Sequence, residues 1–292
     1  MPCRTAVLAA AVGPIAYFLA PAGPLSAAQG PAVADDSAAL LNAQRCFYNA
    51  HYAEAAAATL ELRAAEPDEL GGYELRSSAL LFQLKRALGA QRDRDEALKQ
   101  CATCAELMID FAGETERGQS LARARLAADP QDDAARFFLA KIDLNYVWLE
   151  LGTLGRKKGW SEYWEARRGL DAVLRRHPGN VRARVARAWI DYIVDTKIPR
   201  GTKWVLGGGS RQRALLAVRE AASADGDFYV RVEAAFALWE MEARERNVPE
   251  AIAVAQGLAR DFPENHEVAA FLSANQPDGV RARPAEGPSL PR

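Results

Sequence analysis

The one short motif with a recognised chemistry is Cys101-Ala-Thr-Cys104, two cysteines separated by two residues. This spacing suits either a redox-active thiol pair or a local disulfide. A thioredoxin-type redox site lies beside alternating strands and helices, and no strand pattern surrounds this motif. Because the chain also carries features of an exported protein, we expect a disulfide between Cys101 and Cys104 that ties down its segment. No histidine follows Cys104 directly, which argues against covalent haem attachment.

A metal site is the alternative use of these cysteines. Cys46 and His51, together with Cys101 and Cys104, would supply four ligands of the kinds that zinc accepts. However, the two halves are far apart in the sequence and their spacing matches no recognised zinc motif. Cys46 also falls where the helical repeat described below expects a core aromatic residue, so its role as a small buried apolar side chain explains it without a metal. We therefore predict no metal centre and no cofactor.

Nucleophilic catalysis has little support in the sequence. None of the three histidines has neighbours that suggest a catalytic triad; they are His51, His177 and His266. The glycine run 207–209 lacks the Gly-Lys-Ser/Thr ending of a nucleotide-binding phosphate loop. Ser210 and Arg211 at the following helix start suit either an anion site or a flexible turn with solvated arginines. We predict that the protein is not an enzyme.

Two basic, aromatic and glycine-rich inserts, 152–160 and 197–209, interrupt the helical pattern. Mixed cationic and aromatic loops suit an acidic peptide, a carboxylate or phosphate ligand, or a membrane surface. The alternative is that both tryptophans pack inward and only anchor long loops. In the first case, the rim of a binding surface consists of Lys157, Lys158, Trp160, Lys203, Trp204 and Arg211.

Two aspartates lie in otherwise apolar segments just before these inserts. Asp143 lies within 142–148 and Asp191 within 189–194, and the 48 residues that separate Pro130 from Pro178 also separate these aspartates. Each aspartate either faces a ligand groove, or caps a neighbouring helix or pairs with an arginine. The first alternative predicts a groove lined by Asp143, Asn145, Trp148, Trp189 and Asp191.

The elements that must position these residues are helices. From Ser37 to about Asn275 the chain is rich in Ala, Leu, Glu and Arg. Four prolines mark a repeat, namely Pro67, Pro130, Pro178 and Pro263. Twelve residues before them stand four small residues, Ala55, Gly118, Ala166 and Ala251. A small side chain lets two helices approach closely, and a proline ends the second helix of each pair.

This pattern resembles the tetratricopeptide repeat, a helix-turn-helix unit of about 34 residues. The first unit matches best, with Ala43 and Phe47 in its first helix, Tyr52-Ala-Glu-Ala55 opening its second helix and Pro67 closing it. In the last unit, 232–263, Trp239 replaces the expected small residue. The resemblance implies an all-α, right-handed superhelix of about five antiparallel helix pairs over 37–275, with inserts in the middle units and a terminal helix near 267–274.

Composition and the chain ends bound the class of protein. With 49% hydrophobic and 26% charged residues the chain has a globular composition, and a net charge of −1 argues against a nucleic-acid partner. Arg4, the apolar run 5–20 and the small residues 26–28 are typical of a secretory signal peptide covering 1–28, with a membrane anchor as the alternative. We expect a flexible leader at 29–36 and a disordered tail at 276–292.

These features together predict a non-enzymatic scaffold that is exported, as to a bacterial periplasm. Its groove and two inserts would hold a protein or peptide partner or a small anionic ligand, and a peripheral membrane contact also fits the basic, aromatic loops. The units resemble those of exported bacterial tetratricopeptide proteins. Some small helical proteins of this kind accompany substrate-binding transport systems, so a ligand-holding partner of a periplasmic transporter is the second expectation. A thiol-redox protein built on Cys101 and Cys104 is the third.

Overall fold

The computed structural model describes residues 38–89, 91–197 and 203–275, all within one compact unit, Val33–Arg292. Within these ranges the chain is helical and contains no strand. The expected signal peptide (1–28), leader (29–36) and tail (276–292) lie outside the described residues, as does Arg200 of the second insert.

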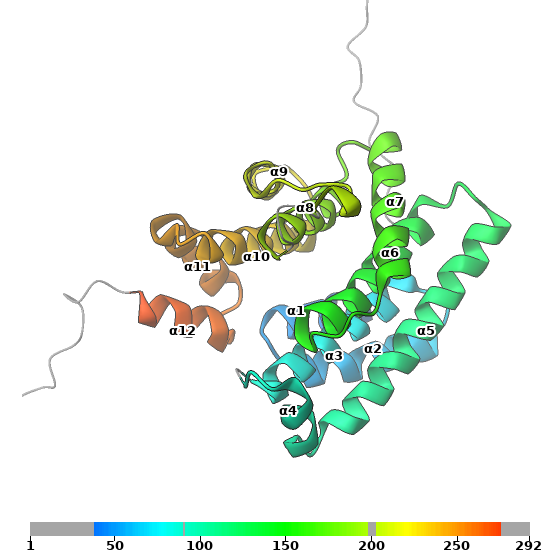
Figure 1. Ribbon diagram of the computed structural model, residues 1–292, viewed down its shortest axis with the longest axis horizontal. Coiled ribbons are helices and arrows are strands. Elements are labelled where there is room, and N and C mark those ends of the chain that lie inside the picture. The colour runs from blue at the N-terminus through cyan, green and yellow to red at the C-terminus, as the bar shows by residue number, and fades with distance from the viewer. Residues whose placement is uncertain (1–37, 90, 198–202, 276–292) are drawn as a thin grey trace, which may run out of the picture. The chain divides into compact units, whose positions relative to one another are not determined.

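Short turns connect most of the consecutive helices (Figure 1). Their bounds are α1 Ala38–Tyr48, α2 Tyr52–Ala65, α3 Leu70–Leu88, α4 Arg94–Gln100, α5 Cys104–Ala128, α6 Asp133–Val147, α7 Trp160–Arg176, α8 Val181–Lys197, α9 Arg211–Ala222, α10 Phe228–Arg244, α11 Val248–Asp261 and α12 His266–Ala274. A π-helical turn, η1 (Trp148–Thr153), continues α6, and a 3-10 turn, η2 (Lys203–Leu206), lies between α8 and α9.

Neighbouring helices pack as five pairs. These are pair 1 (α1 and α2), pair 2 (α3 and α5), pair 3 (α6 and α7), pair 4 (α8 and α9) and pair 5 (α10 and α11). The first helices of several pairs also pack on one another, as α3 does on α1 and α6, and α12 packs on α11. The predicted all-α, helical-repeat-like fold is confirmed. No described helix combines the length and the apolar character that crossing a membrane requires.

The small residues and the prolines do what the repeat pattern predicts. Ala55, Ala166 and Ala251 are fully buried. A Cβ atom at Gly118 would lie only 2.8 Å from Ile142 Cδ1 and 3.0 Å from Tyr73 Cβ, so this helix crossing has no room for a side chain. Each of four helices ends two residues before a proline, namely α2, α5, α7 and α11. The proline ring clashes with the preceding residue and disfavours a helical conformation there.

The first and last pairs touch each other. The Tyr48 ring at the end of α1 stacks on the rings of Tyr229 and Phe236 of α10, with centroids 5.9 and 5.2 Å apart. Asn265, the N-cap of α12, donates its side-chain amide to the Tyr48 carbonyl oxygen at 2.7 Å. Glu267 of α12 also lies 3.0 Å from the Arg86 guanidinium of α3. Contacts between distant segments therefore add to those between neighbouring helices.

Four charged side chains from four pairs form one ion cluster. Lys141 of α6 lies 2.6 Å from Glu233 of α10 and 3.5 Å from Glu74 of α3. Arg182 of α8 lies 2.6 and 3.6 Å from the same two carboxylates. The four side chains are only 8 to 24% exposed. Burial alone would raise the pKa of Glu233, but the Lys141 and Arg182 charges outweigh it and lower that pKa.

Candidate binding surface

The start of α7 joins the two basic, aromatic inserts. The Tyr163 ring, in the first turn of α7, meets the Trp160 ring edge-on with centroids 6.3 Å apart. The Tyr163 hydroxyl donates to the Leu206 carbonyl oxygen at 2.9 Å, at the end of the second insert. One turn later, Arg167 donates to the Gly207 carbonyl oxygen at 2.9 Å. The ends of both inserts therefore lie against the first two turns of one helix.

Glycines in the second insert allow this close approach. Gly207 has φ +78°, a left-handed conformation that favours glycine, and a Cβ atom there would lie 2.9 Å from the Arg167 guanidinium carbon. A Cβ atom at Gly209 would lie 2.4 Å from the Asp191 carbonyl oxygen. The glycine run therefore lets the insert pack on α7 and α8, which explains its composition without a bound phosphate.

Several large side chains of these inserts remain exposed. Trp204 is 77% exposed, Val205 52% and Trp160 40%. Lys157 and Lys158 are exposed beside Trp160. The alternative in which both tryptophans pack inward is therefore not what the structure shows. We call Lys157, Lys158, Trp160, Trp204 and Val205 the two-insert surface. Sequence reasoning missed Val205, because one apolar residue beside a tryptophan carries no signal of exposure.

The expected rim cations differ in what they contact. Lys157 and Lys158 form no ion pair with any described residue, whereas Lys203 pairs with Asp195 and Arg211 lies 3.4 Å from Glu245. The Lys203 hydrogen bond, followed by the one from the Arg211 backbone N–H, lowers the pKa of Asp195. Of the expected rim cations, only Lys157 and Lys158 therefore offer a positive charge that the described chain does not already neutralise.

Two expected groove residues lie between helices instead. Asp143 has no exposed surface, and one of its oxygens accepts a hydrogen bond from the Gln119 side chain of α5 at 2.8 Å. Asn145 donates its side-chain amide to the Ser77 and Ser78 hydroxyls of α3 at 2.8 and 3.0 Å. Both polar groups satisfy contacts between packed helices, so neither lines an open groove.

The other expected groove residues are also engaged within the chain. Asp191 lies 2.7 Å from Arg187 and 3.5 Å from Arg167, which matches the arginine-pairing alternative. Trp148 is partly buried against two apolar clusters, one built mainly from α2, α3 and α5 and the other from α6, α7 and α8. Trp189 is partly buried with the Arg244 guanidinium 5.7 Å from its ring centroid. The five residues do not converge on one site.

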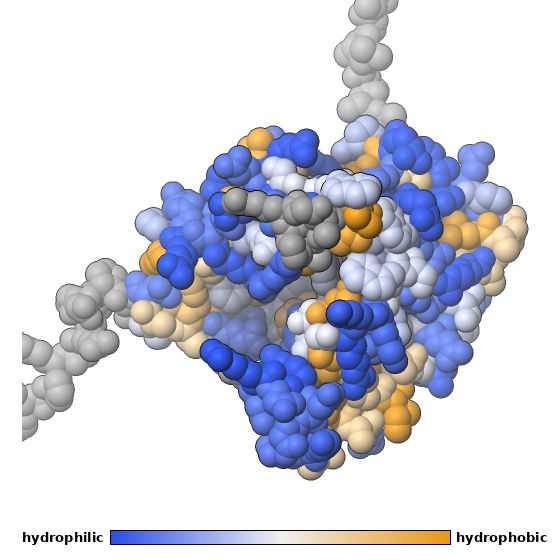
Figure 2. Space-filling view, in the orientation of Figure 1, coloured by the Kyte–Doolittle hydropathy of each residue, from blue (hydrophilic) through white to orange (hydrophobic). Residues whose placement is uncertain are grey.

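The face drawn in Figure 2 agrees with this description. It is mostly hydrophilic, with apolar residues in small separate patches rather than in one continuous groove. The side chains that do converge from α3, α6, α8 and α10 are those of the ion cluster, and they satisfy one another.

The structure also contains a cleft, away from the two-insert surface, that the sequence did not predict. It has a volume of about 410 Å³ and is bordered by the starts of α2, α5 and α12 and the end of α3. Its lining residues are Ala50, His51, Tyr52, Ala53, Glu54, Gln83, Arg86, Ala87, Thr103, Leu107 and His266. These residues come from four separate segments, so no local spacing could have grouped them.

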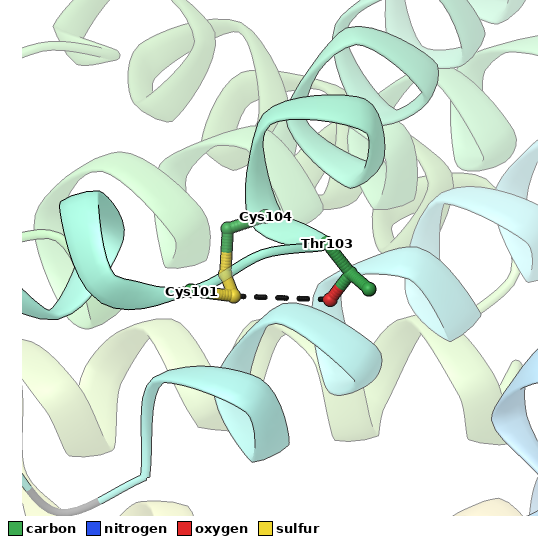
Figure 3. The surroundings of a disulfide bond; sticks show 3 residues. All are labelled: Cys101, Thr103 and Cys104. Atoms are coloured by element: carbon green, nitrogen blue, oxygen red, sulfur yellow. Dashed lines mark hydrogen bonds between the residues drawn. A yellow bond between two sulfur atoms is a disulfide. The ribbon is translucent and has the colours of Figure 1, made fainter.

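The cysteines of the short motif form a disulfide. The Cys101 and Cys104 sulfurs are bonded at 2.04 Å, in the turn between α4 and α5 (Figure 3). Cys46 is not part of a disulfide. Among the described residues, no group of three or more histidine, cysteine, aspartate and glutamate side chains could hold a metal ion.

Neither a protein-family model nor a curated protein sequence matches this chain. A functional proposal therefore has to rest on the contacts, the exposure and the charges described above.

Proposed function

We propose that the protein is an exported binding protein of tetratricopeptide type that holds an acidic segment of a partner protein on its two-insert surface. The observation that supports this proposal most is the grouping, around the start of one helix, of two exposed tryptophans and two lysines that have no ion-pair partner among the described residues. The signal-like N-terminus supports export.

The apolar members of this surface supply the affinity. Tryptophans bury a large area at a small entropic cost, and they dominate the energetic centres of protein interfaces. Trp160 and Trp204 belong to two inserts that both pack on α7, and Val205 extends the apolar area beside Trp204. A partner side chain that covers these groups would remove apolar surface from water.

The lysines of the surface favour a partner segment with negative charge. Arg156, Arg167 and Lys203, which belong to the inserts or to the start of α7, all face carboxylates of the protein itself. Lys157 and Lys158 have no such partner among the described residues, so they complement an acidic segment and speed its association.

The exposure of the surface favours a protein segment over a small ligand. Small-molecule sites are concave and bury most of the ligand surface. A side chain that is 77% exposed, as Trp204 is, does not line such a pocket. An extended or helical peptide can instead cover a broad, open surface.

The test uses synthetic peptides rich in aspartate and glutamate, each with one central leucine, and matched lysine-rich peptides. We expect the acidic peptides to bind more tightly, with an affinity that falls as salt is added. Lys157→Ala with Lys158→Ala should slow association and reduce the salt dependence. Trp204→Ala should weaken binding by about tenfold, as loss of an interface tryptophan does. Titration calorimetry and stopped-flow fluorescence measure both effects.

Matched controls change the same chemistry elsewhere. Arg92→Ala with Lys99→Ala removes two exposed positive charges near α4, and Ile109→Ala removes a side chain that is 73% exposed on α5. Both should leave peptide binding unchanged. Equal binding of acidic and basic peptides, or equal losses in the control variants, would contradict the proposal. Native mass spectrometry gives a further test. If the wild type retains a small anion and the double lysine variant does not, the ligand of this surface is that anion and not an acidic peptide.

A further inference from the structure

The two sulfurs of the Cys101–Cys104 disulfide lie in different surroundings. Cys104 is the first residue of α5 and has no exposed surface. Cys101, the C-cap of α4, is partly exposed. An incoming thiolate can therefore reach the Cys101 sulfur and not the Cys104 sulfur. This asymmetry gives an exchange reaction a defined direction, since attack occurs on the accessible sulfur.

Thr103 places a hydroxyl group beside the accessible sulfur. Its Oγ1 atom lies 3.8 Å from Cys101 Sγ, and Figure 3 shows the hydroxyl directed at that sulfur. Thr103 is also the N-cap of α5, yet its side chain makes no capping hydrogen bond to the helix. The hydroxyl is therefore available to donate to a thiolate on Cys101.

The cleft borders Thr103, the neighbour of the disulfide, although neither cysteine lines it. Thr103 and Leu107 of the α5 start form part of its wall, and the α2 start forms another part with His51 and Tyr52. The residue that contacts the Cys101 sulfur thus also borders a space of about 410 Å³. Residues that flank a cysteine in a partner polypeptide can occupy this space while its thiol approaches Cys101.

A purely structural role explains little of this arrangement. The disulfide closes a loop of only four residues, and the stabilisation expected from a cross-link decreases as its loop shortens. A disulfide with only a structural role would not require the hydroxyl group that Thr103 places beside Cys101 Sγ.

We propose that Cys101–Cys104 is a redox-active pair that oxidises cysteine thiols of a partner polypeptide through Cys101. A substrate thiolate attacks Cys101 Sγ, a mixed disulfide forms, the Cys101–Cys104 bond breaks and Cys104 leaves as a thiolate that takes a proton from water. A second substrate thiolate then attacks the substrate sulfur of the mixed disulfide and releases Cys101. The substrate loses two electrons and becomes a disulfide, and the protein pair gains them and becomes a dithiol. This activity does not depend on the two-insert surface.

The first experiment tests whether the pair exchanges. The full chain carrying Cys3→Ser and Cys46→Ser is equilibrated with mixtures of reduced and oxidised glutathione, quenched with acid, alkylated and weighed by mass spectrometry. We expect a mixture of oxidised and reduced protein whose proportions follow the glutathione ratio. A structural disulfide resists reduction by glutathione. Protein that stays oxidised in every mixture, with its fold unchanged by circular dichroism, would overturn the proposal.

The second experiment tests the roles of the two sulfurs. In Cys104→Ser the remaining Cys101 thiol should form a mixed disulfide with oxidised glutathione at least about tenfold faster than Cys104 does in Cys101→Ser, because accessibility and thiolate character control the rate. Cys46 gives an internal comparison in both variants, since burial, followed by the nearby Glu54 charge, raises the pKa of its thiol. Equal rates for Cys101 and Cys104 would contradict the assigned direction of attack.

The third experiment tests Thr103 as a positioning residue. Thr103→Val keeps the shape of the side chain and removes the hydroxyl. In the Cys104→Ser background it should move the midpoint of the pH–rate profile of Cys101 to higher pH and slow the reaction near neutral pH by up to about tenfold, the value of a hydrogen bond to a charged group. Thr103→Ser should restore the wild-type profile. Identical profiles for all three proteins would show that the hydroxyl does not act on the sulfur.

Discussion

The carboxyl group of Asp143 is fully buried. It lies on α6 and faces α5 and α7 with no exposed surface, and its Oδ2 atom has no hydrogen-bond partner among the described residues. The Arg123 guanidinium is 4.0 Å away and is engaged with Glu165 at 2.6 Å. Burial, followed by the Glu165 charge, raises the pKa of Asp143 to about 8. At neutral pH this side chain is therefore mostly protonated.

The raised pKa of Asp143 predicts a stability that depends on pH. Because the folded-state pKa of about 8 exceeds the unfolded value, the stabilising effect of protonation is complete below about pH 4 and is lost as pH rises to about 8. Asp143→Asn removes this dependence. The variant should gain stability relative to wild type across this window, with a slope of at most about 1.4 kcal/mol per pH unit. Urea unfolding at a series of pH values measures the difference.

An exposed aspartate provides the control for this prediction. Asp225→Asn, in the turn between α9 and α10, should differ little from wild type in stability, as exposed surface substitutions usually do. The difference in the free energy of unfolding between wild type and Asp143→Asn should grow from about pH 4 to about pH 8. If it stays constant over this range, Asp143 is ionised in the folded protein.

The sequence related Asp143 to Asp191 but could not predict their environments. The shared spacing from Pro130 and Pro178 places them at equivalent positions of α6 and α8. Asp191 is partly exposed and is paired with Arg187 and Arg167, whereas Asp143 is enclosed beside Gln119. The difference arises from side chains on other helices, which a repeat alignment of one chain does not place.

At the scale of one helix, α5 contains two glycines with opposite surroundings. Gly118 sits in the crossing with α3 and α6, where an added Cβ atom would meet Ile142 at 2.8 Å and Tyr73 at 3.0 Å. An added Cβ atom at Gly113 would meet only the end of the Arg117 side chain, at 3.9 Å. Both glycines lower the helix propensity of α5 equally, so packing alone distinguishes them.

Alanine substitutions at these glycines should change stability in opposite directions. Gly113→Ala should raise the free energy of unfolding by about 0.5 to 1 kcal/mol, through helix propensity. Gly118→Ala should lower it by about 1 to 2 kcal/mol, because overpacking costs more than the propensity gain. Thermal and urea unfolding of both variants measure these changes. Equal stabilisation by both would show that α3 and α6 can move away from α5 at little cost.

The elements were more predictable than the site. Helix ends, small crossing residues and the positions of the inserts follow from local sequence, since proline and side-chain size act on their own turn or crossing. The packing of both inserts on the start of α7 does not, because it depends on Tyr163 and Arg167 reaching the backbone of residues about 40 positions away.

At the scale of the whole chain, the ion cluster links the first helices of four pairs. Glu233 contacts both Lys141 and Arg182, and Glu74 completes the cluster from α3. These residues are up to 159 positions apart, since 233 − 74 = 159, so neither periodicity nor spacing could have predicted their contact. In a largely buried cluster, each charge depends on its partners, and the loss of one leaves the others uncompensated.

Neutralising Glu233 should therefore destabilise the whole protein. We expect Glu233→Gln to lower the free energy of unfolding by about 3 kcal/mol, because two cations lose a largely buried counter-charge. Glu220→Gln is the matched control, since Glu220 contacts Arg184 at 2.6 Å but is 56% exposed, and it should cost at most about 1 kcal/mol. Urea denaturation measures both, and similar losses in the two variants would contradict a special role for the cluster.

The contact between the first and last pairs has a consequence for how this chain could have changed in evolution. In an open repeat array each unit touches only its neighbours, so tandem duplication or loss of a unit leaves the others in place. Here an additional unit would have to separate Tyr48 from Tyr229 and Phe236, and Arg86 from Glu267. Duplication would therefore break contacts at both ends of the chain at once, which constrains the copy number of the units as strongly as the core constrains their side chains.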